Sequence, residues 1–275
     1  MTPILCFDLE TIPDADGLRR LGMFDATLDD ASGVAEVQSA RRESHGSDFL
    51  PHYLQRVWVI GCAFRDQDGF RVRCLGDHHG ASDAEESARL RSFFKIIEKH
   101  TPQLVSWNGS GFDGPVLHHR ALIHGVSAPR YWDQGDDDRD FKWNNYIARY
   151  HARHTDLMDV LSGYQNRAFA PLDNLARLCG FAGKLGEDGS KVWSSFLEGR
   201  GEAVRAYCET DVVNTYLLFC RFRLIRGEWS EAQYDEELVV VREALSAMIG
   251  QEGVPLAGEH WRAFLNAAPA LRAPL

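Results

Sequence analysis

The hydrophobic pattern of the chain predicts four strands, with helices placed between and after them. Apolar runs rich in β-branched and aromatic residues occupy residues 4–12, 57–65, 70–75 and 103–107. The tight turn at 66–69 predicts an antiparallel hairpin between the second and third strands. Helical periodicity is expected over 82–100, 115–124, 202–226 and 231–249, with short helices at 155–163 and 171–179. This order predicts an α/β fold with a central mixed sheet, antiparallel in its first three strands and parallel afterwards, flanked by helices.

The 275 residues are expected to form one domain over 1–250, followed by a helical tail at 251–275. Residues 16–50 are polar and show little periodicity apart from a possible helix near 32–43, so we interpret them as an insertion over the strand ends. The aspartate-rich turn at 133–140 lacks the ligand spacing of a calcium loop and is interpreted as solvated. A glycine-rich loop at 180–189 contains Lys184.

Two carboxylates stand at the end of the otherwise apolar first strand. Because strand side chains alternate between faces, Asp8 and Glu10 point the same way, beside each other. Burying two like charges is unfavourable by several kcal/mol, roughly, unless a cation lies between them. A divalent metal would satisfy both, since hard cations prefer carboxylate oxygens. The alternative is a strand end that opens into solvent, where both acids are hydrated.

Composition narrows the class of protein. The formal net charge of −10 argues against coating nucleic acid by bulk charge, although bound metal can supply local positive charge to an enzyme. No apolar run is long enough to span a membrane, and the N-terminus lacks the pattern of a signal peptide. The six cysteines are scattered without a C-x-x-C pair, which is typical of reduced core residues. We therefore expect a cytoplasmic protein without a membrane contact.

Two further acids stand at positions where a charge is unusual. Asp113 follows the fourth strand at the predicted start of a helix, and taken alone this position favours a helix N-terminal anion. Asp211 falls on the apolar stripe of the helix at 202–226, one turn after Tyr207, and could instead be a buried aspartate bonded to that tyrosine. One arrangement explains all four acids if they converge on a shared site. Four carboxylates can hold two Mg²⁺ or Mn²⁺ ions about 3.5–4 Å apart, a site that hydrolyses phosphodiesters.

Three segments carry a resemblance to a known family. Residues 7–11 (Phe-Asp-Leu-Glu-Thr), Asn108-x-x-x-Phe112-Asp113 and Tyr207-x-x-x-Asp211 resemble, in order, the three motifs of the DEDD 3′–5′ exonucleases. More closely, the chain resembles the predicted exonucleases related to the proofreading domain of family-B DNA polymerases. Residues 154–160, 180–184 and 207–212 support this resemblance, which covers about residues 3–225. It implies a ribonuclease H-like fold.

The resemblance also implies a role for each motif residue. A histidine-type member would carry His where this chain has Ala206, so Tyr207 indicates the tyrosine type, DEDDy, in which it orients the attacking water. The metal ligands would be Asp8, Glu10, Asp113 and Asp211, with Glu10 also near the water. Residues expected near the terminal nucleotide are Leu9, Thr11, Asn108 and Phe112. We hypothesise that Lys184 contacts a phosphate or the water, although it could be a lysine on a mobile loop.

These features predict a metal-dependent 3′–5′ exonuclease that releases nucleoside 5′-monophosphates from single-stranded 3′ ends, with DNA favoured over RNA. A polymerase or repair partner would be needed for proofreading. Two alternatives are a non-catalytic nucleic-acid-binding or polymerase-associated module of the same fold, and a phosphodiesterase for small nucleotides. The aromatic and basic stretch at 141–154 could stack single-stranded bases or could pack internally.

Overall fold

A five-stranded mixed sheet forms the centre of the molecule. The computed structural model describes residues 2–76, 80–185 and 189–272. The strands are β1 (Ile4–Pro13), β2 (Gln55–Asp66), β3 (Gly69–Leu75), β4 (Gln103–Ser106) and β5 (His154–Asp156), in the order β3-β2-β1-β4-β5. The pairs β3–β2 and β2–β1 are antiparallel, whereas β1–β4 and β4–β5 are parallel. The predicted mixed sheet, with its antiparallel and parallel parts, is confirmed.

The fifth strand corrects one expectation. The sequence predicts a helix over 155–163, but residues 154–156 pair with β4 and only α6 (Leu157–Leu161) is helical. A strand of three residues is too short to show alternation, so its strand character depends on pairing with β4. Asp156 ends this strand, and its side chain accepts hydrogen bonds from the backbone N–H groups of Met158 and Asp159 at the start of α6.

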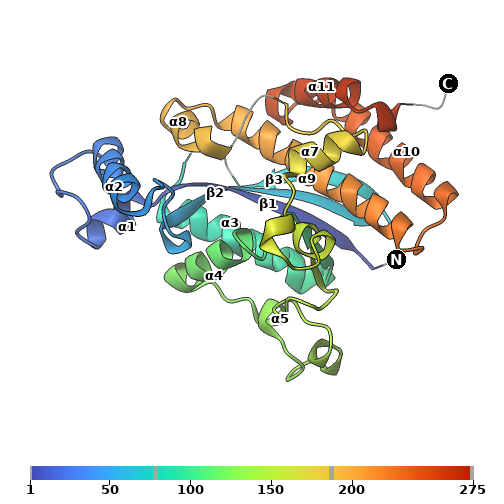
Figure 1. Ribbon diagram of the computed structural model, residues 1–275, viewed down its shortest axis with the longest axis horizontal. Coiled ribbons are helices and arrows are strands. Elements are labelled where there is room, and N and C mark those ends of the chain that lie inside the picture. The colour runs from blue at the N-terminus through green and yellow to red at the C-terminus, as the bar shows by residue number, and fades with distance from the viewer. Residues whose placement is uncertain (1, 77–79, 186–188, 273–275) are drawn as a thin grey trace.

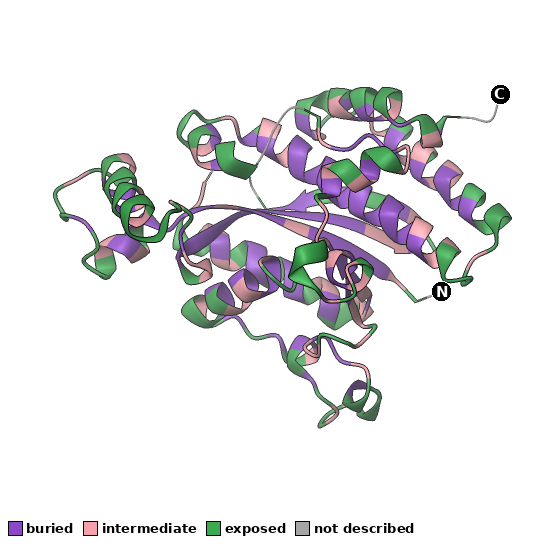
Figure 2. Cartoon of the chain, in the orientation of Figure 1, coloured by how far each residue is buried: buried purple, intermediate pink, exposed green. Residues whose placement is uncertain are grey.

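Helices cover both faces of the sheet (Figure 1). The helices α3 (Asp83–His100), α4 (Asp113–His124) and α5 (Pro129–Trp132) lie on one side, and Leu5, Phe7 and Leu9 of β1 contribute to that core. The helices α9 (Gly201–Ile225), α10 (Glu231–Ala247) and α11 (Glu259–Ala267) lie on the other side, where Ile4 and Cys6 point. The expected alternation of β1 therefore divides its side chains between two cores. Figure 2 shows the sheet buried between the helices.

The shorter helices complete the two layers. They are α7 (Leu172–Leu178) and α8 (Val192–Leu197), together with 3-10 turns at His52–Leu54, Arg139–Lys142, Asn166–Ala168, Gly189–Lys191, Pro255–Gly258 and Pro269–Leu271.

The C-terminal segment belongs to the core: Trp261 and Phe264 of α11 are fully buried in the cluster that contains α9. His260 Nε2 lies 3.1 Å from Glu209 Oε2, so α11 contacts α9 two residues before Asp211.

The segment at 16–50 contains two helices, α1 (Ala15–Arg20) and α2 (Asp30–His45), which project from one end of the sheet (Figure 1). The predicted helix near 32–43 is present, whereas α1 was not expected. A small separate cluster that includes Leu18, Val34 and Val37 holds the two helices together. Its few apolar positions explain why the sequence shows little periodicity there.

A buried ion-pair network ties the end of β1 to α4. Arg120 Nη1 lies 2.5 Å from Asp14 Oδ2, and its Nε donates to Glu86 Oε1 at 2.8 Å. Arg56 contacts the other oxygen of Asp14 at 2.7 Å. Burial opposes ionisation of Asp14, but the guanidinium groups of Arg120 and Arg56 outweigh it and lower the pKa of that carboxyl. The network fixes α4, which begins at Asp113, against the strand that carries Asp8 and Glu10.

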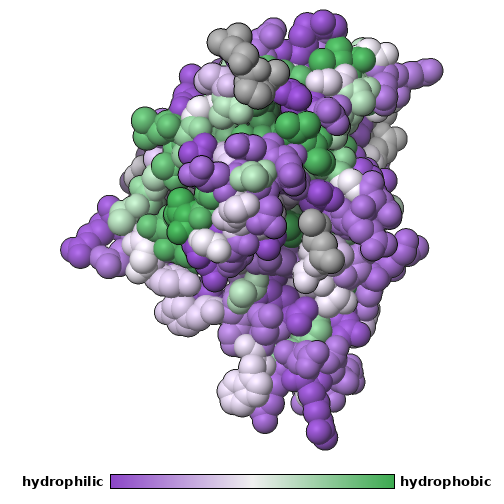
Figure 3. All heavy atoms as spheres, turned by 90° about the vertical axis from the view of Figure 1, so that its right-hand side faces the viewer, coloured by the Kyte–Doolittle hydropathy of each residue, from purple (hydrophilic) through white to green (hydrophobic). Residues whose placement is uncertain are grey.

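The surface agrees with the interpretation of the acidic turn. The lower tip of the molecule, where the segment after α5 lies in Figure 1, is hydrophilic in Figure 3. Asp136, Asp137 and Asp140 are exposed, as expected of a solvated turn, while Asp133 accepts hydrogen bonds from the backbone of Gly135 and Asp138.

All six cysteines are free. Among the described residues, none of the helices combines the length and hydrophobicity that a membrane span requires.

Candidate active site

The site begins at the carboxyl end of β1, in the middle of the sheet. The pairing of β1 with β2 is irregular between Glu10 and Thr11, directly after the two acids. Asp8 is half-buried and Glu10 is buried, so the strand does not simply open into solvent. Both acids lie on the side of the sheet that α9 covers, because Cys208 of α9 lies against Asp8, with its Sγ 3.8 Å from Asp8 Oδ2.

The second motif forms a tight turn that places Asp113 next to β1. Asn108 adopts a left-handed conformation with a φ of 65°, and Asp156 accepts the backbone N–H groups of Asn108 and Ser110 at 3.0 and 2.8 Å. Asp113 is the first residue of α4, and its Oδ1 accepts the backbone N–H of Leu9 at 2.9 Å. The carboxylate of Asp113 is therefore bonded to the residue that separates Asp8 from Glu10.

The third motif comes from α9 and is completed by Lys184. Tyr207 and Asp211 are both buried, one helical turn apart. Lys184 Nζ lies 3.3 Å from Asp211 Oδ2 and also donates to the Tyr207 hydroxyl. The backbone N–H of Lys184 donates to Asp173 Oδ1 at 2.6 Å, which anchors this residue to α7. Residues 186–188 of the predicted glycine-rich loop lie outside the described residues.

A cavity of about 540 Å³ opens above these groups. Its lining includes the expected residues Asp8, Leu9, Glu10, Thr11, Asn108, Phe112, Lys184, Tyr207 and Asp211. Asp113 is not part of the lining and lies behind it, bonded to Leu9. The Thr11 hydroxyl donates to Gln55 Oε1 at 3.0 Å, so this side chain is already held in place. The cavity thus brings these residues from four distant segments to one surface.

Burial and mutual repulsion make the ionised forms of these acids unfavourable. Burial and the charges of Asp113 and Asp211 raise the pKa of Asp8 well above its usual value. Burial and the charge of Asp8 do the same to the pKa of Glu10. Burial raises the pKa of Asp113 to about 7, although backbone N–H groups stabilise its ionised form. Burial also opposes the charge on Lys184, but Asp211 and Asp8 outweigh it and raise the pKa of its ammonium.

This donor set fits a divalent cation. Within the described part of the chain, the buried Oδ1 of Asp211 has no hydrogen-bond partner, which is unfavourable for a carboxylate oxygen unless a ligand satisfies it. Asp8, Glu10 and Asp211 interact with the ammonium of Lys184, and Asp113 adds a fourth carboxylate close to Asp8, so negative charge exceeds positive charge among these residues. Ligand atoms of Asp8, Glu10 and Cys208 also lie within 4.8 Å of one another. Hard carboxylate oxygens in excess are the ligands that Mg²⁺ and Mn²⁺ prefer.

One protein family matches most of this chain. Residues 47–268 match the model of a family described as predicted 3′–5′ exonucleases related to the exonuclease domain of PolB. The chain belongs to this family. Membership of this family supports a 3′–5′ exonuclease with a divalent metal requirement.

Solved structures of Escherichia coli exonuclease I also resemble the chain. The zinc-bound complex with single-stranded DNA is 12% identical, with a TM-score of 0.39, and the match covers 90% of this chain and 45% of that one. The complex with a dA16 oligonucleotide is 15% identical, with a TM-score of 0.34, and the match covers 90% and 46%. The chain thus spans less than half the length of exonuclease I, and the likeness is distant.

Several residues around the family's motifs escaped the sequence analysis. Phe49 and His52 line the cavity, and their ring centroids lie 5.7 and 5.6 Å from that of Phe112. Phe49 lies at the end of the polar insertion and His52 just after it, and neither belongs to a motif, so only their aromatic character before β2 indicates them. In the sequence, Asp156 belongs only to a segment that supports the family resemblance, and its role in holding the second motif's turn requires the β4–β5 pairing.

Gly61 provides the room that α9 needs above the sheet. It pairs with Asp8 on one side and Cys74 on the other, and a Cβ at this position would lie 2.6 Å from Cys208 Sγ. We expect Gly61→Ala to displace α9, lower the free energy of unfolding by about 1–3 kcal/mol and reduce activity. Thermal unfolding and nuclease rates measure both effects.

A double variant tests whether the clash with Cys208 causes these losses. Combining Gly61→Ala with Cys208→Ala removes the sulfur and should recover part of the lost stability, whereas Cys208→Ala alone should leave the backbone of α9 in place. Strictly additive losses in the double variant would show that the clash with Cys208 is not the cause.

Proposed function

We propose that this chain is a metal-dependent exonuclease that removes nucleotides from the 3′ ends of single-stranded nucleic acid and releases nucleoside 5′-monophosphates. The proposal is supported by Asp8, Glu10 and Asp211 in the lining of one cavity and by Asp113 bonded to Leu9 behind it. Asp211 Oδ1 also has no hydrogen-bond partner among the described residues. The relation of the family to a polymerase exonuclease domain favours DNA over RNA. The catalytic residues would be the four acids and Tyr207.

The four acids would hold two divalent cations, Mg²⁺ or Mn²⁺. When bound, such ions lower the pKa of a water molecule and offset negative charge on the leaving 3′ oxygen. The Asp8 and Glu10 side chains supply oxygens from β1, Asp113 from α4 and Asp211 from α9. The backbone N–H of Leu9 keeps the Asp113 carboxylate oriented toward this group. No side chain is required as a nucleophile.

The remaining residues position the strand and the water. Leu9, Thr11 and Phe112 line the cavity beside the acids, where they can enclose the terminal nucleoside together with Asn108. Burial and the charge of Asp211 raise the pKa of Tyr207, so its hydroxyl keeps its proton. It can therefore donate one hydrogen bond and accept another, which suits the orientation of a water molecule. Lys184 offers a charged donor for a phosphate oxygen beside it.

A directional assay tests the proposed function. Matched single strands of DNA and RNA, labelled at the 5′ end, are incubated with Mg²⁺ or Mn²⁺ or with excess chelator. We expect a ladder of labelled fragments that shorten from the 3′ end, unlabelled 5′-monophosphates as products, faster loss of DNA than of RNA, and no reaction in chelator. A labelled mononucleotide released at once would indicate attack from the 5′ end and contradict the proposal.

Tyr207→Phe separates positioning of the water from metal binding. Removing the hydroxyl leaves the buried ring and the four carboxylates in place, so we expect kcat to fall on the order of 10²-fold. The metal concentration at half-maximal stabilisation should stay close to that of the wild type, as measured by thermal unfolding in a Mn²⁺ titration. Loss of metal binding in this variant would place the hydroxyl among the ligands instead.

A further inference from the structure

A cavity of about 430 Å³ lies at the end of the sheet opposite to the catalytic acids. It is lined by Thr2, Gln103, Asn144, Ala152, Arg153, Arg223 and Trp229. Thr2 precedes β1, whose carboxyl end carries Asp8 and Glu10, and Figure 1 marks the N-terminus beside the end of α9. Arg223 follows Asp211 by twelve residues in α9, which is about 18 Å along the helix axis at 1.5 Å per residue. None of the residues that line this cavity lines the catalytic one.

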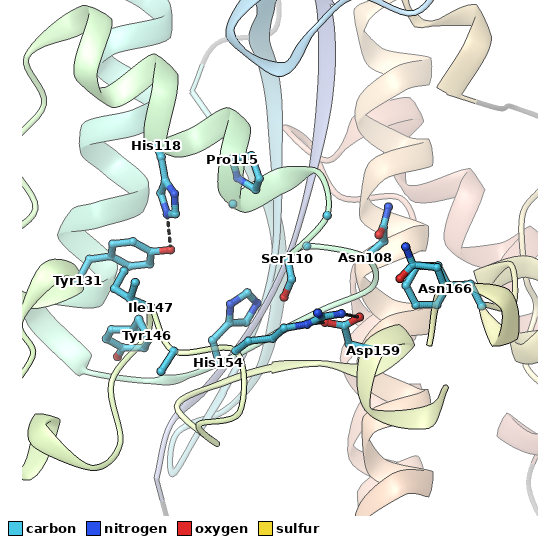
Figure 4. A pocket seen from close by; sticks show the side chains of 16 residues that line it. Asn108, Ser110, Pro115, His118, Tyr131, Tyr146, Ile147, His154, Asp159 and Asn166 are labelled. Carbon is cyan, nitrogen blue, oxygen red and sulfur yellow. Dashed lines mark hydrogen bonds and ion pairs between the residues drawn. The ribbon is translucent and has the colours of Figure 1, made fainter. Parts of the chain in front are cut away.

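The aromatic and basic stretch at 141–154 forms part of the wall. Asn144, Ala152 and Arg153 come from it, whereas Ile147 of the same stretch lines a different cavity, of about 440 Å³, beside the turn of the second motif (Figure 4). No described residue lines both of these cavities. The cavity at the start of the sheet is therefore a separate candidate site.

Arg153 is held in a fixed orientation in this wall. Its backbone N–H donates to Asn144 Oδ1 at 2.8 Å, and its Nε donates to the carbonyl oxygen of Asn144. Its guanidinium carbon lies 3.9 Å from the ring centroid of Phe141, which is buried. Among the described residues, no carboxylate forms an ion pair with Arg153. Its positive charge is therefore available to a ligand.

Arg223 brings a second guanidinium to the cavity, beside an aromatic ring. Its guanidinium carbon lies 4.5 Å from the ring centroid of Trp229. Its Nε lies 3.0 Å from Glu228 Oε2, and the other oxygen of that carboxylate lies 3.0 Å from Arg226 Nη2. One carboxylate thus serves two guanidiniums. Together with Arg153, this group carries more positive than negative charge, although the chain as a whole has a net charge of −10.

The other polar groups of the lining are neutral. Asn144 uses its Oδ1 for the backbone of Arg153, which leaves its Nδ2 as the group that can donate to a ligand. Gln103 Nε2 donates to Thr155 Oγ1 at 3.0 Å. The lining contains no acid among the described residues. Guanidinium groups in this setting suit a phosphate, since each presents several donors to its oxygens, and an adjacent indole suits a sugar or base.

We propose that this cavity binds the phosphate group of a nucleotide, apart from the catalytic cavity. Arg153 and Arg223 bind the phosphate oxygens, and Trp229 lies against the sugar or base. The phosphate has two sources, the nucleoside 5′-monophosphate that the proposed reaction releases and an internal phosphate of the strand. The choice of a nucleotide rests on the proposed function, whereas binding of its phosphate requires neither a metal nor cleavage.

Isothermal titration calorimetry in excess chelator tests the proposal, because the catalytic acids then have no cation with which to attract a phosphate. The probes are thymidine 5′-monophosphate, thymidine and a strand of ten thymidine nucleotides. Arg153→Gln and Arg223→Gln each remove one charge from the cavity. Arg226→Gln is the matched control, since Arg226 pairs with the same Glu228 as Arg223 but does not line the cavity.

We expect the wild type to bind thymidine 5′-monophosphate but not thymidine, and each cavity variant to weaken this binding by about tenfold. The control should bind like the wild type. Tighter binding of the strand, weakened in the same two variants, assigns the site to the strand, whereas equal or weaker binding assigns it to the free nucleotide.

Three results would overturn the proposal: no binding of either phosphate-bearing probe to the wild type, equal binding of thymidine and its monophosphate, or the same loss in the control as in the cavity variants. If Arg153→Gln does not fold, the comparison of Arg223→Gln with Arg226→Gln decides the outcome.

Failure of the proposed function would be recognised separately. A wild type that shortens no strand in Mg²⁺ or Mn²⁺, but binds the monophosphate in chelator through Arg223, contradicts the exonuclease and supports this cavity. A wild type that shortens strands in metal, but binds no phosphate-bearing probe in chelator, does the reverse.

Discussion

Asp211→Asn is expected to abolish shortening of single strands while leaving the protein folded. The substitution keeps the shape of a buried side chain and removes one of the four carboxylates that would hold cations. Loss of a ligand removes several kcal/mol, roughly, of transition-state stabilisation, which corresponds to a rate at least about 10³-fold lower. Single-turnover degradation of a 5′-labelled strand in Mg²⁺ measures this loss.

The same variant should be more stable than the wild type without metal, because it relieves repulsion among buried acids. Burial raises the pKa of Asp211, Asp8 and Asp113, the last to about 7, so the folded protein binds more protons than the unfolded chain. The free energy of unfolding of the metal-free wild type should therefore fall as pH rises from about 4 to about 7, and that of Asp211→Asn should fall less. Denaturant titrations across this range measure both slopes.

Asp136→Asn supplies the matched control, since it removes the same charge from the exposed turn at 133–140. It should retain wild-type activity and wild-type pH dependence of stability. If Asp211→Asn kept activity near that of this control, Asp211 would not be a ligand and the shared site would need a different composition.

Addition of Mn²⁺ or Mg²⁺ is expected to stabilise the wild type strongly. A cation that binds only the folded site stabilises by about 2.7 kcal/mol at a free concentration one hundred times its Kd. For a chain of this size the gain corresponds to about 5–8 °C in Tm. Asp8→Asn and Asp211→Asn should show a much smaller shift, because each removes a carboxylate from the acid group. Calorimetry in a metal titration gives both values.

Lys184 provides an internal check on this interpretation. Its ammonium now offsets part of the negative charge beside Asp211 and Tyr207, so Lys184→Met should destabilise the metal-free protein and increase the stabilisation by Mn²⁺. Equal Tm shifts in the wild type, Lys184→Met and Asp211→Asn would mean that the cation binds somewhere else.

The sequence predicted the parts of the fold that depend on local patterns. The alternation of residues 4–12, the hairpin at 66–69 and the apolar stripe of α9 each specify their element within one segment, and the structure contains all three. Short segments, and segments with few apolar residues, show too little periodicity to predict their secondary structure. The three-residue β5 was predicted as helix because its strand character comes from β4, and α1 was missed because its small cluster has few apolar positions.

The aromatic and basic stretch at 141–154 shows why one segment can serve two purposes. Phe141 and Tyr146 are buried, and the Arg153 guanidinium lies 3.9 Å from the centroid of Phe141, which is internal packing. Ile147, Ala148 and Arg149 line the cavity beside the turn of the second motif instead. Sequence alone left both interpretations open, because a side chain's neighbours across the fold decide whether it is buried or lines a cavity.

By itself, the sequence predicted the proposed chemistry, because acids at the end of an apolar strand, at the start of a helix and on a helix's buried stripe are unfavourable unless a cation compensates them. Only the tertiary structure decided how they meet. The bond from Leu9 to Asp113, the contact of Lys184 with Asp211 and the space that Gly61 leaves for Cys208 join residues between 27 and 147 positions apart. Such contacts follow from chain packing, which no local pattern encodes.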